Sequence, residues 1–182
     1  MKQGIQEQDP GSFRNGTRII GIDPGTRYTG IGIIDRVDNR LKYIFSETIV
    51  TVKLPTIEDK LEVIFNRIGE VVDKFHPQRA AVERIFHSVN PRSSLLLGHA
   101  RGVAILSLKL KGVSLFEYAP NEVKSAVVGV GRATKDQVNN MVKILLNIDR
   151  SRNVKEDEAD ALANAICHAN TTDFEGYSKL SH

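Results

Sequence analysis

The sequence predicts a single α/β domain in which helices flank one mixed five-stranded sheet. Two observations lead to this prediction. The chain has 182 residues, of which 41% are hydrophobic, and this size and composition suit one domain with a substantial core. Its strand-like segments come first as a run of three and then alternate with helical patterns, an order typical of a mixed sheet. We expect residues 1–17 to form a flexible extension, residues 18–170 the domain and residues 171–182 a C-terminal tail.

Five segments have the composition of β-strands. Residues 18–23, 29–35 and 41–52 are apolar or rich in β-branched residues, and turn-forming sequences join them, so they should form an antiparallel meander. Two shorter apolar segments, residues 79–83 and 114–118, should complete the sheet.

Five further segments are predicted to be helices, from apolar residues that recur at three- and four-residue steps or from start signals. They span residues 57–75, 93–111, 120–128, 135–146 and 155–168. Thr134 and Gln137 have capping-box spacing, which places the start of the fourth helix at Lys135. In residues 93–111 the apolar side chains spread over much of the helix circumference. That helix should therefore lie in the centre of the core or be half buried against a partner chain.

Two carboxylates come at the ends of predicted strands. Asp23 follows an apolar run and precedes the turn Pro24-Gly25, and Glu83 ends the fourth strand. A charge within strand-like sequence is unfavourable unless a cation or a donor compensates it, so a metal ion is one candidate partner and an ordinary hairpin is the alternative. Gly30 and Gly32 leave one face of the next strand without side chains. A bulky group such as a phosphate backbone could approach there.

The last helix begins with four acids, which are Glu156, Asp157, Glu158 and Asp160. Acids at a helix N-terminus interact favourably with the helix dipole by roughly 0.3 to 1 kcal/mol each, so this run could serve only for capping and solvation. Asp157 and Asp160, however, are three residues apart and share one face, whereas Glu156 and Glu158 point elsewhere. We expect at least one of the two aspartates to face the sheet.

Convergence of Asp23, Glu83, Asp157 and Asp160 would concentrate negative charge at one place. Each pair would repel by roughly 4 kcal/mol at ~4 Å with an effective dielectric constant near 20. Mg²⁺ or Mn²⁺ would remove this penalty, because both ions prefer oxygen ligands. Up to two such ions could activate a water molecule and stabilise the leaving oxygen at phosphorus. A phosphodiester is therefore the predicted substrate.

Charge is unevenly distributed along the chain. Residues 84–143 carry nine Lys or Arg against three Asp or Glu, whereas residues 144–182 carry four against seven. This asymmetry suggests a cationic surface beside the acids, as a polyanionic substrate would require, although a solvated basic face is the simpler explanation of charge alone.

The sequence also limits the compartment. Cys167 is the single cysteine, so no disulfide can form within the chain and a reducing environment is expected. No segment approaches the ~18 uninterrupted apolar residues of a membrane span, and the N-terminus lacks the apolar region of a signal peptide. We expect a cytoplasmic protein.

Six sequence motifs together resemble those of a known enzyme family. They are GIDPGTRYTGIGIID, VERIF, LGHARGVAI, FEYAPNEVK, VVGVGRATKDQV and DEADALANAICH. In this order and spacing they resemble the RuvC family of bacterial Holliday-junction resolvases, within the RNase H-like superfamily, over about residues 18–170. The resemblance implies an RNase H-like fold and a homodimer that cuts two opposed strands of a four-way DNA junction. The nicks would carry 5′-phosphate and 3′-hydroxyl ends, and the branch-migration proteins RuvA and RuvB are the implied partners in recombination and DNA repair.

The resemblance also implies roles for single residues. The catalytic and metal-binding acids fall on Asp23, Glu83, Asp157 and Asp160, with Mg²⁺ as the expected ion. Phe86 should stack on bases or wedge into the junction, although such a residue is more often part of a core. Further DNA contacts are expected from a basic set, which is Arg92, Lys124, Arg132 and Lys135. The C-terminal tail lacks the basic residues that many members carry there, so it should add little DNA affinity.

Four alternatives remain at the level of sequence. GIDPGT also resembles the first phosphate-binding turn of sugar kinases and actin-like phosphotransferases, but these need a second such domain, for which the chain has no internal copy. A YqgF-type nuclease acting on ribosomal RNA precursors would share the chemistry but would not explain VERIF or LGHARGVAI. A non-catalytic DNA-binding module would not require all four acids. Finally, His168, two turns beyond Asp160, could be either an outer support of the acids or a core histidine.

Overall fold

The computed structural model describes residues 16–38, 40–84, 91–149 and 151–178. Most of the predicted N-terminal extension lies outside this range, and Phe86 does as well, so the predictions for them are untested. None of the helices in the described part of the chain is both long and apolar enough to cross a lipid bilayer.

The sheet has the five strands that the sequence predicts. They are β1 (Gly16–Asp23), β2 (Tyr28–Val37), β3 (Arg40–Val50), β4 (Arg79–Glu83) and β5 (Ser114–Tyr118). Their order across the sheet is β3-β2-β1-β4-β5. The first three strands pair antiparallel as a meander, while β4 and β5 run parallel to β1. The prediction of one mixed sheet is therefore confirmed.

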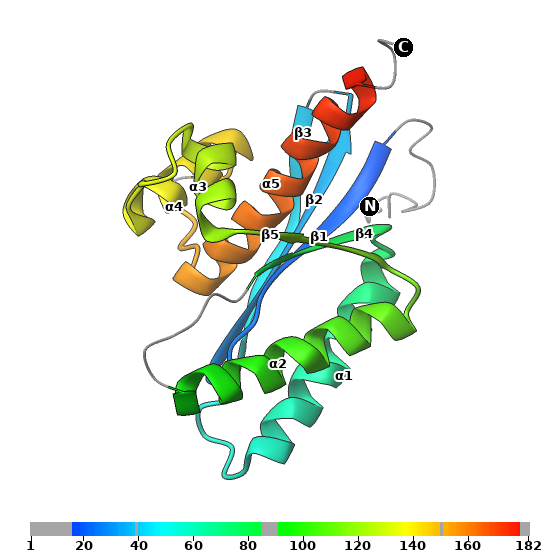
Figure 1. Ribbon diagram of the computed structural model, residues 1–182, viewed down its shortest axis with the longest axis vertical. Helices are drawn as coiled ribbons and strands as arrows, with labels where there is room; N and C mark the ends of the chain where they lie inside the picture. The colour runs from blue at the N-terminus through cyan, green and yellow to red at the C-terminus, as the bar shows by residue number, and fades with distance from the viewer. Residues whose placement is uncertain (1–15, 39, 85–90, 150, 179–182) are drawn as a thin grey trace, which may run out of the picture.

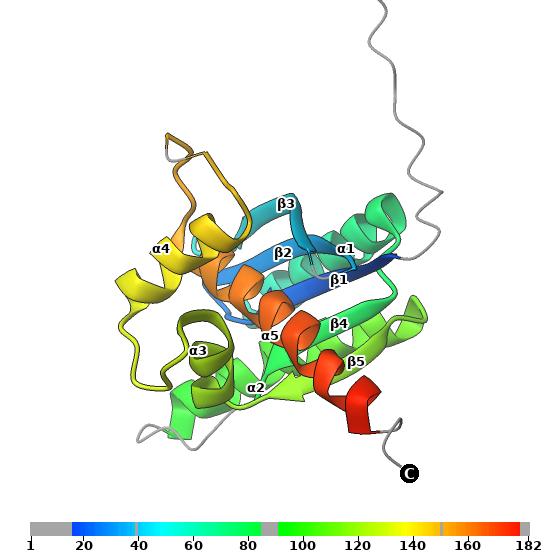
Figure 2. The ribbon, with the colours of Figure 1, turned by 90° about the horizontal axis from the view of Figure 1, so that it is seen from above.

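Helices cover both faces of the sheet. α1 (Ile57–Phe75) and α2 (Pro91–Leu110) pack together on one face, and α3 (Pro120–Val128), α4 (Lys135–Leu145) and α5 (Glu156–Ser178) lie on the other (Figure 1). Seen from above, α5 crosses the sheet directly, and α3 and α4 pack beside it (Figure 2).

Helix α5 is longer than predicted. It continues to Ser178, so the predicted end at His168 is wrong. The physical reason lies in the sequence that follows, because no proline occurs there and no glycine comes before Gly176 to stop the helix.

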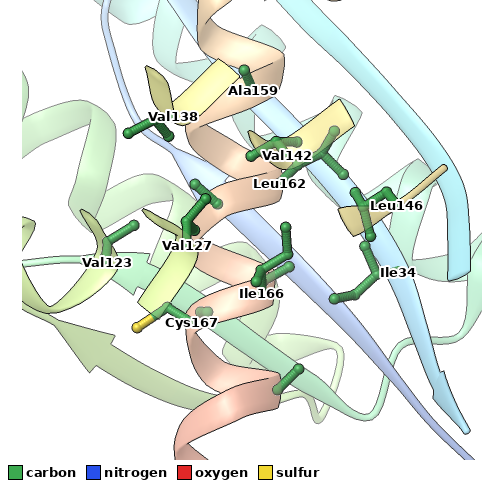
Figure 3. Close-up of a cluster of buried hydrophobic side chains, with 14 of the residues drawn as sticks. Ile34, Val123, Val127, Val138, Val142, Leu146, Ala159, Leu162, Ile166 and Cys167 are labelled. Atoms are coloured by element: carbon green, nitrogen blue, oxygen red, sulfur yellow. The ribbon is translucent and has the colours of Figure 1, made fainter. Parts of the chain in front are cut away.

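Strand residues alternate between two hydrophobic cores. Ile20, Ile22 and Ile31 belong to the core beneath α1 and α2, whereas Ile19 and Ile34 belong to the core beneath α3, α4 and α5. Figure 3 shows this second core, in which side chains of α3 and α4 meet those of α5 and the sheet. The alternation places Gly21, Gly30 and Gly32 on the α5 face as well.

These glycines seat α5 against the sheet. A Cβ atom at Gly30 would lie 1.9 Å from the carbonyl oxygen of Asp157, and one at Gly21 would lie 1.9 Å from that of Ala161. A Cβ atom at Gly32 would lie 2.7 Å from the backbone nitrogen of Leu162. The prediction that a phosphate backbone could use the space at Gly30 and Gly32 is therefore wrong, because the backbone of α5 occupies it.

Helix α2 is not central to the core. Its buried stripe consists of Ala100, Ala104, Ser107 and Leu108, and the rest of its circumference is open or partly open. Leu95, Leu106 and Leu110 are 61%, 50% and 68% exposed. The predicted place of this helix in the centre of the core is therefore wrong, and its contact with a partner chain stays a prediction.

The seating of α5 predicts the effect of an added methyl group. Gly30→Ala should lower the free energy of unfolding by about 1 to 3 kcal/mol or more, because Asp157 must move to admit the new Cβ atom. Gly69→Ala is the matched control, since its Cβ atom would meet nothing closer than 3.5 Å. This change lies within α1 and should stabilise the protein by up to about 1 kcal/mol. Urea denaturation measures both, and equal stability of Gly30→Ala and the parent chain would contradict the prediction.

Candidate active site

Two of the four predicted acids come from neighbouring strands. Asp23 is the last residue of β1 and Glu83 the last residue of β4, and the two strands are parallel with Ile22 opposite Val82. Both carboxylates therefore emerge at the same edge of the sheet, where open α/β sheets place their active groups. Buried Thr29 shapes the turn after Asp23, because its hydroxyl donates to the carbonyl of Gly25 at 2.7 Å.

The other two acids come from the first turns of α5. Asp157 lies over Gly30, which is itself paired with Asp23 across β1 and β2. Asp160 lies one turn further along the same face of the helix. The close contact at Gly30 thus brings the start of α5 to the strand end that carries Asp23.

The four acids influence one another electrostatically. The pKa of Asp23 is raised to about 8, first by burial and then by the negative charges of Asp160, Glu83 and Asp157. The pKa of Glu83 is raised by burial and by Asp160. Burial is also the main cause that raises the pKa of Asp160. Asp23 is thus close enough to the other three acids for their charges to act on it, whereas the role of the four acids as a metal site stays a prediction.

Two lysines partly offset this negative charge. Lys124 and Lys135 both lower the pKa of Glu83 and of Asp160. Lys135, at the start of α4, forms an ion pair with Glu156, and its Nζ atom lies 4.0 Å from Oδ2 of Asp160. The two lysines that the sequence assigns to DNA contacts thus lie beside the acids.

The remaining predicted DNA contacts are at other positions. Arg92 is exposed in the first turn of α2, and Arg132 is exposed in the turn between α3 and α4. Neither position tests the prediction that these side chains bind DNA.

Comparison with known proteins identifies the family. The family model described as "Crossover junction endodeoxyribonuclease RuvC" matches residues 19–168. The chain belongs to the RuvC family. A curated RuvC from Methylobacillus flagellatus is 50% identical over 157 residues, which cover 84% of this chain and 86% of the relative. A RuvC from Geotalea uraniireducens is 44% identical over 163 residues, with 90% and 94% of the two chains covered.

Solved RuvC structures share the fold. The structure of Thermus thermophilus RuvC in complex with a Holliday junction substrate superimposes with a TM-score of 0.80 and 28% sequence identity. The match covers 87% of this chain and 96% of that one. These findings confirm the RNase H-like fold of the RuvC family and remove the phosphotransferase and YqgF-type alternatives.

The first turn of α5 is anchored by residues that the sequence did not single out for this role. Glu158 is buried and accepts a hydrogen bond from the Ser46 hydroxyl at 2.7 Å, so it ties the helix to β3. The guanidinium of Arg152 lies over the ring of Tyr43, with 4.5 Å between the guanidinium carbon and the ring centroid, on the same side of the sheet. Glu158 thus points away from the four acids, as predicted. The same prediction is wrong for Glu156, because it shares Lys135 with Asp160 and its charge raises the pKa of Asp160.

Two further residues beside the acids were also missed. Asn164 donates from Nδ2 to the carbonyl oxygen of Ile22 at 2.9 Å. Arg101 of α2 donates from Nε to the carbonyl oxygen of Glu83 at 3.3 Å and pairs with Glu117. An amide within the apolar helical pattern ALANAI is a signal that could have identified Asn164, whereas nothing local distinguishes Arg101 from a solvated arginine.

His168 is a core histidine. It is fully buried, its Nδ1 atom lies 2.7 Å from the hydroxyl of Tyr118, and its ring centroid lies 4.2 Å from that of Phe116. Burial, together with the charges of Arg79 and Arg36, lowers its pKa to about 4. Its position two turns beyond Asp160 and its hydrogen bond to Tyr118 favour the core role over support of the acids.

The acids fit a hard divalent cation by their chemistry. All four donors are carboxylates, and their coupled charges are what such an ion would neutralise. Within the described residues, no three acid, histidine or cysteine side chains are already arranged as ligands of one ion. Cation binding would therefore require the carboxylates to turn toward a common point.

The raised pKa of Asp23 predicts a pH-dependent stability difference. The folded state holds the proton of Asp23 up to about pH 8, whereas the unfolded chain releases it near its ordinary value of 3.8. The stability contributed by this proton is therefore lost as the pH rises toward about 8. Asp23→Asn cannot ionise. As the pH rises from about 5 to about 8, the free energy of unfolding of the parent chain should fall relative to that of this variant by up to about 1.4 kcal/mol per pH unit.

Denaturation of both proteins with a chelator present measures this difference. Asp73→Asn, in the exposed last turn of α1, is the control and should show no such trend. A difference between Asp23→Asn and the parent chain that stays constant over this pH range would contradict the prediction.

Proposed function

We propose that this RuvC-family chain resolves four-way DNA junctions by paired, metal-dependent hydrolysis of phosphodiester bonds. The observation that carries the proposal is the convergence of four carboxylates, Asp23, Glu83, Asp157 and Asp160, at one edge of the sheet. Such a cluster is unfavourable for folding, so a role in binding cations explains it better than a role in stability. The family match over residues 19–168 supports the substrate, and so does the solved T. thermophilus RuvC with its Holliday junction. The activity would serve recombination and DNA repair.

The chemistry follows from the acids and their neighbours. As RuvC enzymes are metal-dependent nucleases, we infer that the four acids hold Mg²⁺, with Mn²⁺ as a substitute and up to two ions in each site. The bound ions would supply an activated water and stabilisation of the leaving oxygen. The strand ends fix Asp23 and Glu83, and α5 carries Asp157 and Asp160 to them. Hydrolysis is proposed to leave 5′-phosphate and 3′-hydroxyl ends.

Lysines beside the acids suit a polyanionic substrate. Lys135 is 69% exposed at its side chain, although it is paired with Glu156, so a DNA phosphate could replace this carboxylate as its partner. Lys124 lies close enough to the acids to lower the pKa of Glu83. We include Arg92, Arg132 and Phe86 in the proposed DNA surface on the family resemblance, and Phe86 as the residue that stacks at the junction.

A homodimer is proposed through α2. The exposed side chains of Leu95, Leu106 and Leu110 form an apolar surface on a helix whose other side is buried. Added Cβ atoms at Gly98 and Gly102 would meet nothing within 4 Å, so the backbone is open to close approach by a second helix there. Two copies of the site are what paired cleavage of opposed strands requires. RuvA and RuvB are proposed as partners and the bacterial cytoplasm as the compartment.

Cleavage of a labelled junction tests the proposed function. The parent chain should make paired nicks in a four-way junction with Mg²⁺ and leave a linear duplex intact. Asp23→Asn should lower the rate by at least the ~10- to 100-fold that loss of an outer support of a metal site costs. Asp73→Asn, at the far end of α1, should cleave at the parental rate. Activity of Asp23→Asn equal to that of the parent chain would reject the assignment and favour a non-catalytic DNA-binding module.

Salt dependence of junction binding tests Lys135. Lys135→Ala should weaken binding and reduce the slope of log K against log [salt] by about 1, because one phosphate contact and its released counterion are lost. Binding is measured with Ca²⁺ in place of Mg²⁺ to prevent cleavage. Lys74→Ala, in the last turn of α1, provides the control and should keep the parental slope. An unchanged slope for Lys135→Ala would remove this lysine from the DNA surface.

A further inference from the structure

Asn164 is a buried amide in an apolar part of α5. The residue is 1% exposed, and its immediate neighbours Ala163 and Ala165 are also buried. The Nδ2 atom donates a hydrogen bond to the main-chain oxygen of Ile22 at 2.9 Å. Ile22 immediately precedes Asp23, so this bond joins α5 to β1 one residue before a proposed catalytic carboxylate.

The same face of α5 carries the other two acids of the helix. Asn164 follows Asp160 by four residues and Asp157 by seven, a spacing that aligns all three along one stripe. Beside the bond, Gly21 admits the backbone of Ala161 to the sheet. A single side-chain hydrogen bond thus spans the two elements whose carboxylates must meet.

Packing does not explain an asparagine at this position. The Oδ1 atom of Asn164 is buried and accepts no hydrogen bond from any residue that the structure describes. An apolar side chain of similar shape would avoid the desolvation of that oxygen, so a core built for stability alone would favour leucine. The bond to Ile22 is therefore the feature that distinguishes asparagine from its apolar replacement.

The hydrogen bond between Asn164 and Ile22 would oppose repulsion between the acids. Asp157 lies over Gly30, the partner of Asp23 in the sheet, so ionised carboxylates on α5 and β1 would repel each other and separate the start of α5 from the end of β1. The amide of Asn164 opposes this separation one turn behind Asp160. It lies too far within the core to contact DNA itself.

We propose that Asn164 is a positioning residue that holds Asp157 and Asp160 at a fixed separation from Asp23 and thereby sets the affinity of the site for divalent cations. The proposal rests on the proposed use of these acids as cation ligands. Asn164 acts through the acids and touches no reacting atom. Residues that orient metal ligands in this way typically change cation affinity or activity by about 10- to 100-fold when they are replaced.

Asn164→Leu tests the proposal with a matched control on the same helix. Asn170 also donates from Nδ2 to a main-chain oxygen, that of Ala126 at 3.1 Å, but it joins α5 to α3 rather than to the strand of Asp23. Asn170→Leu therefore removes the same type of bond away from the acids. Both variants and the parent chain are titrated with Mn²⁺ alone by calorimetry in the absence of DNA. Junction cleavage then gives kcat and KM separately.

The expected result separates positioning from general stability. Asn164→Leu should bind Mn²⁺ about tenfold more weakly and show a lower kcat with an unchanged KM for the junction, while its unfolding temperature equals or exceeds that of the parent chain. Asn164→Ala, which removes the amide without filling its space, should show the same loss of cation affinity. Asn170→Leu should retain the parental affinity and kcat.

Three outcomes would overturn the proposal. They are parental Mn²⁺ affinity in Asn164→Leu, equal losses in Asn164→Leu and Asn170→Leu, or a rise in KM without a change in kcat. A parent chain that neither binds Mn²⁺ nor cleaves the junction would instead count against the proposed function, so the two failures are distinguishable.

Discussion

The direct seating of α5 on the sheet is the constraint on which the rest of the structure depends. Gly21, Gly30 and Gly32 admit the helix backbone at distances that no other residue allows. This contact decides the path of α5, and α3 and α4 then pack against it to complete the second core. It also decides where Asp157 lies, because the carbonyl of this residue rests on Gly30. A rule of packing thus determines the position of a proposed catalytic group.

The site that results is electrostatically unfavourable without a cation. Burial and mutual repulsion raise the pKa of Asp23 to about 8, and two lysines offset only part of the negative charge. Anchors around the start of α5 oppose the repulsion, among them the bond between Glu158 and Ser46 and that between Asn164 and Ile22. Functional sites commonly destabilise the folded state in this way, and the packing of the two cores offsets this loss of stability.

The two faces of the sheet have different tasks. The α5 face positions the acids and the lysines, whereas the α1 and α2 face supplies a core and leaves apolar side chains of α2 exposed. In the proposed function both faces contribute, since cutting opposed strands needs a reactive edge and a surface for a second copy. Lys135 combines two features in one residue, because its ammonium group pairs with Glu156 and is also exposed enough to contact a phosphate.

The sequence by itself determined the order of the strands and helices, the mixed sheet and the place of Asp23 and Glu83 at strand ends, because periodicity and turn residues act locally. Helical spacing singled out Asp157 and Asp160 on one face of the last helix, and the family motifs implied their catalytic role and the DNA contacts of the lysines. Only the tertiary structure decided that the glycines of β2 receive a helix rather than a substrate, and that Asn164 reaches Ile22. Both depend on how α5 crosses the sheet, a contact between segments more than a hundred residues apart, and local sequence patterns carry no information about such contacts.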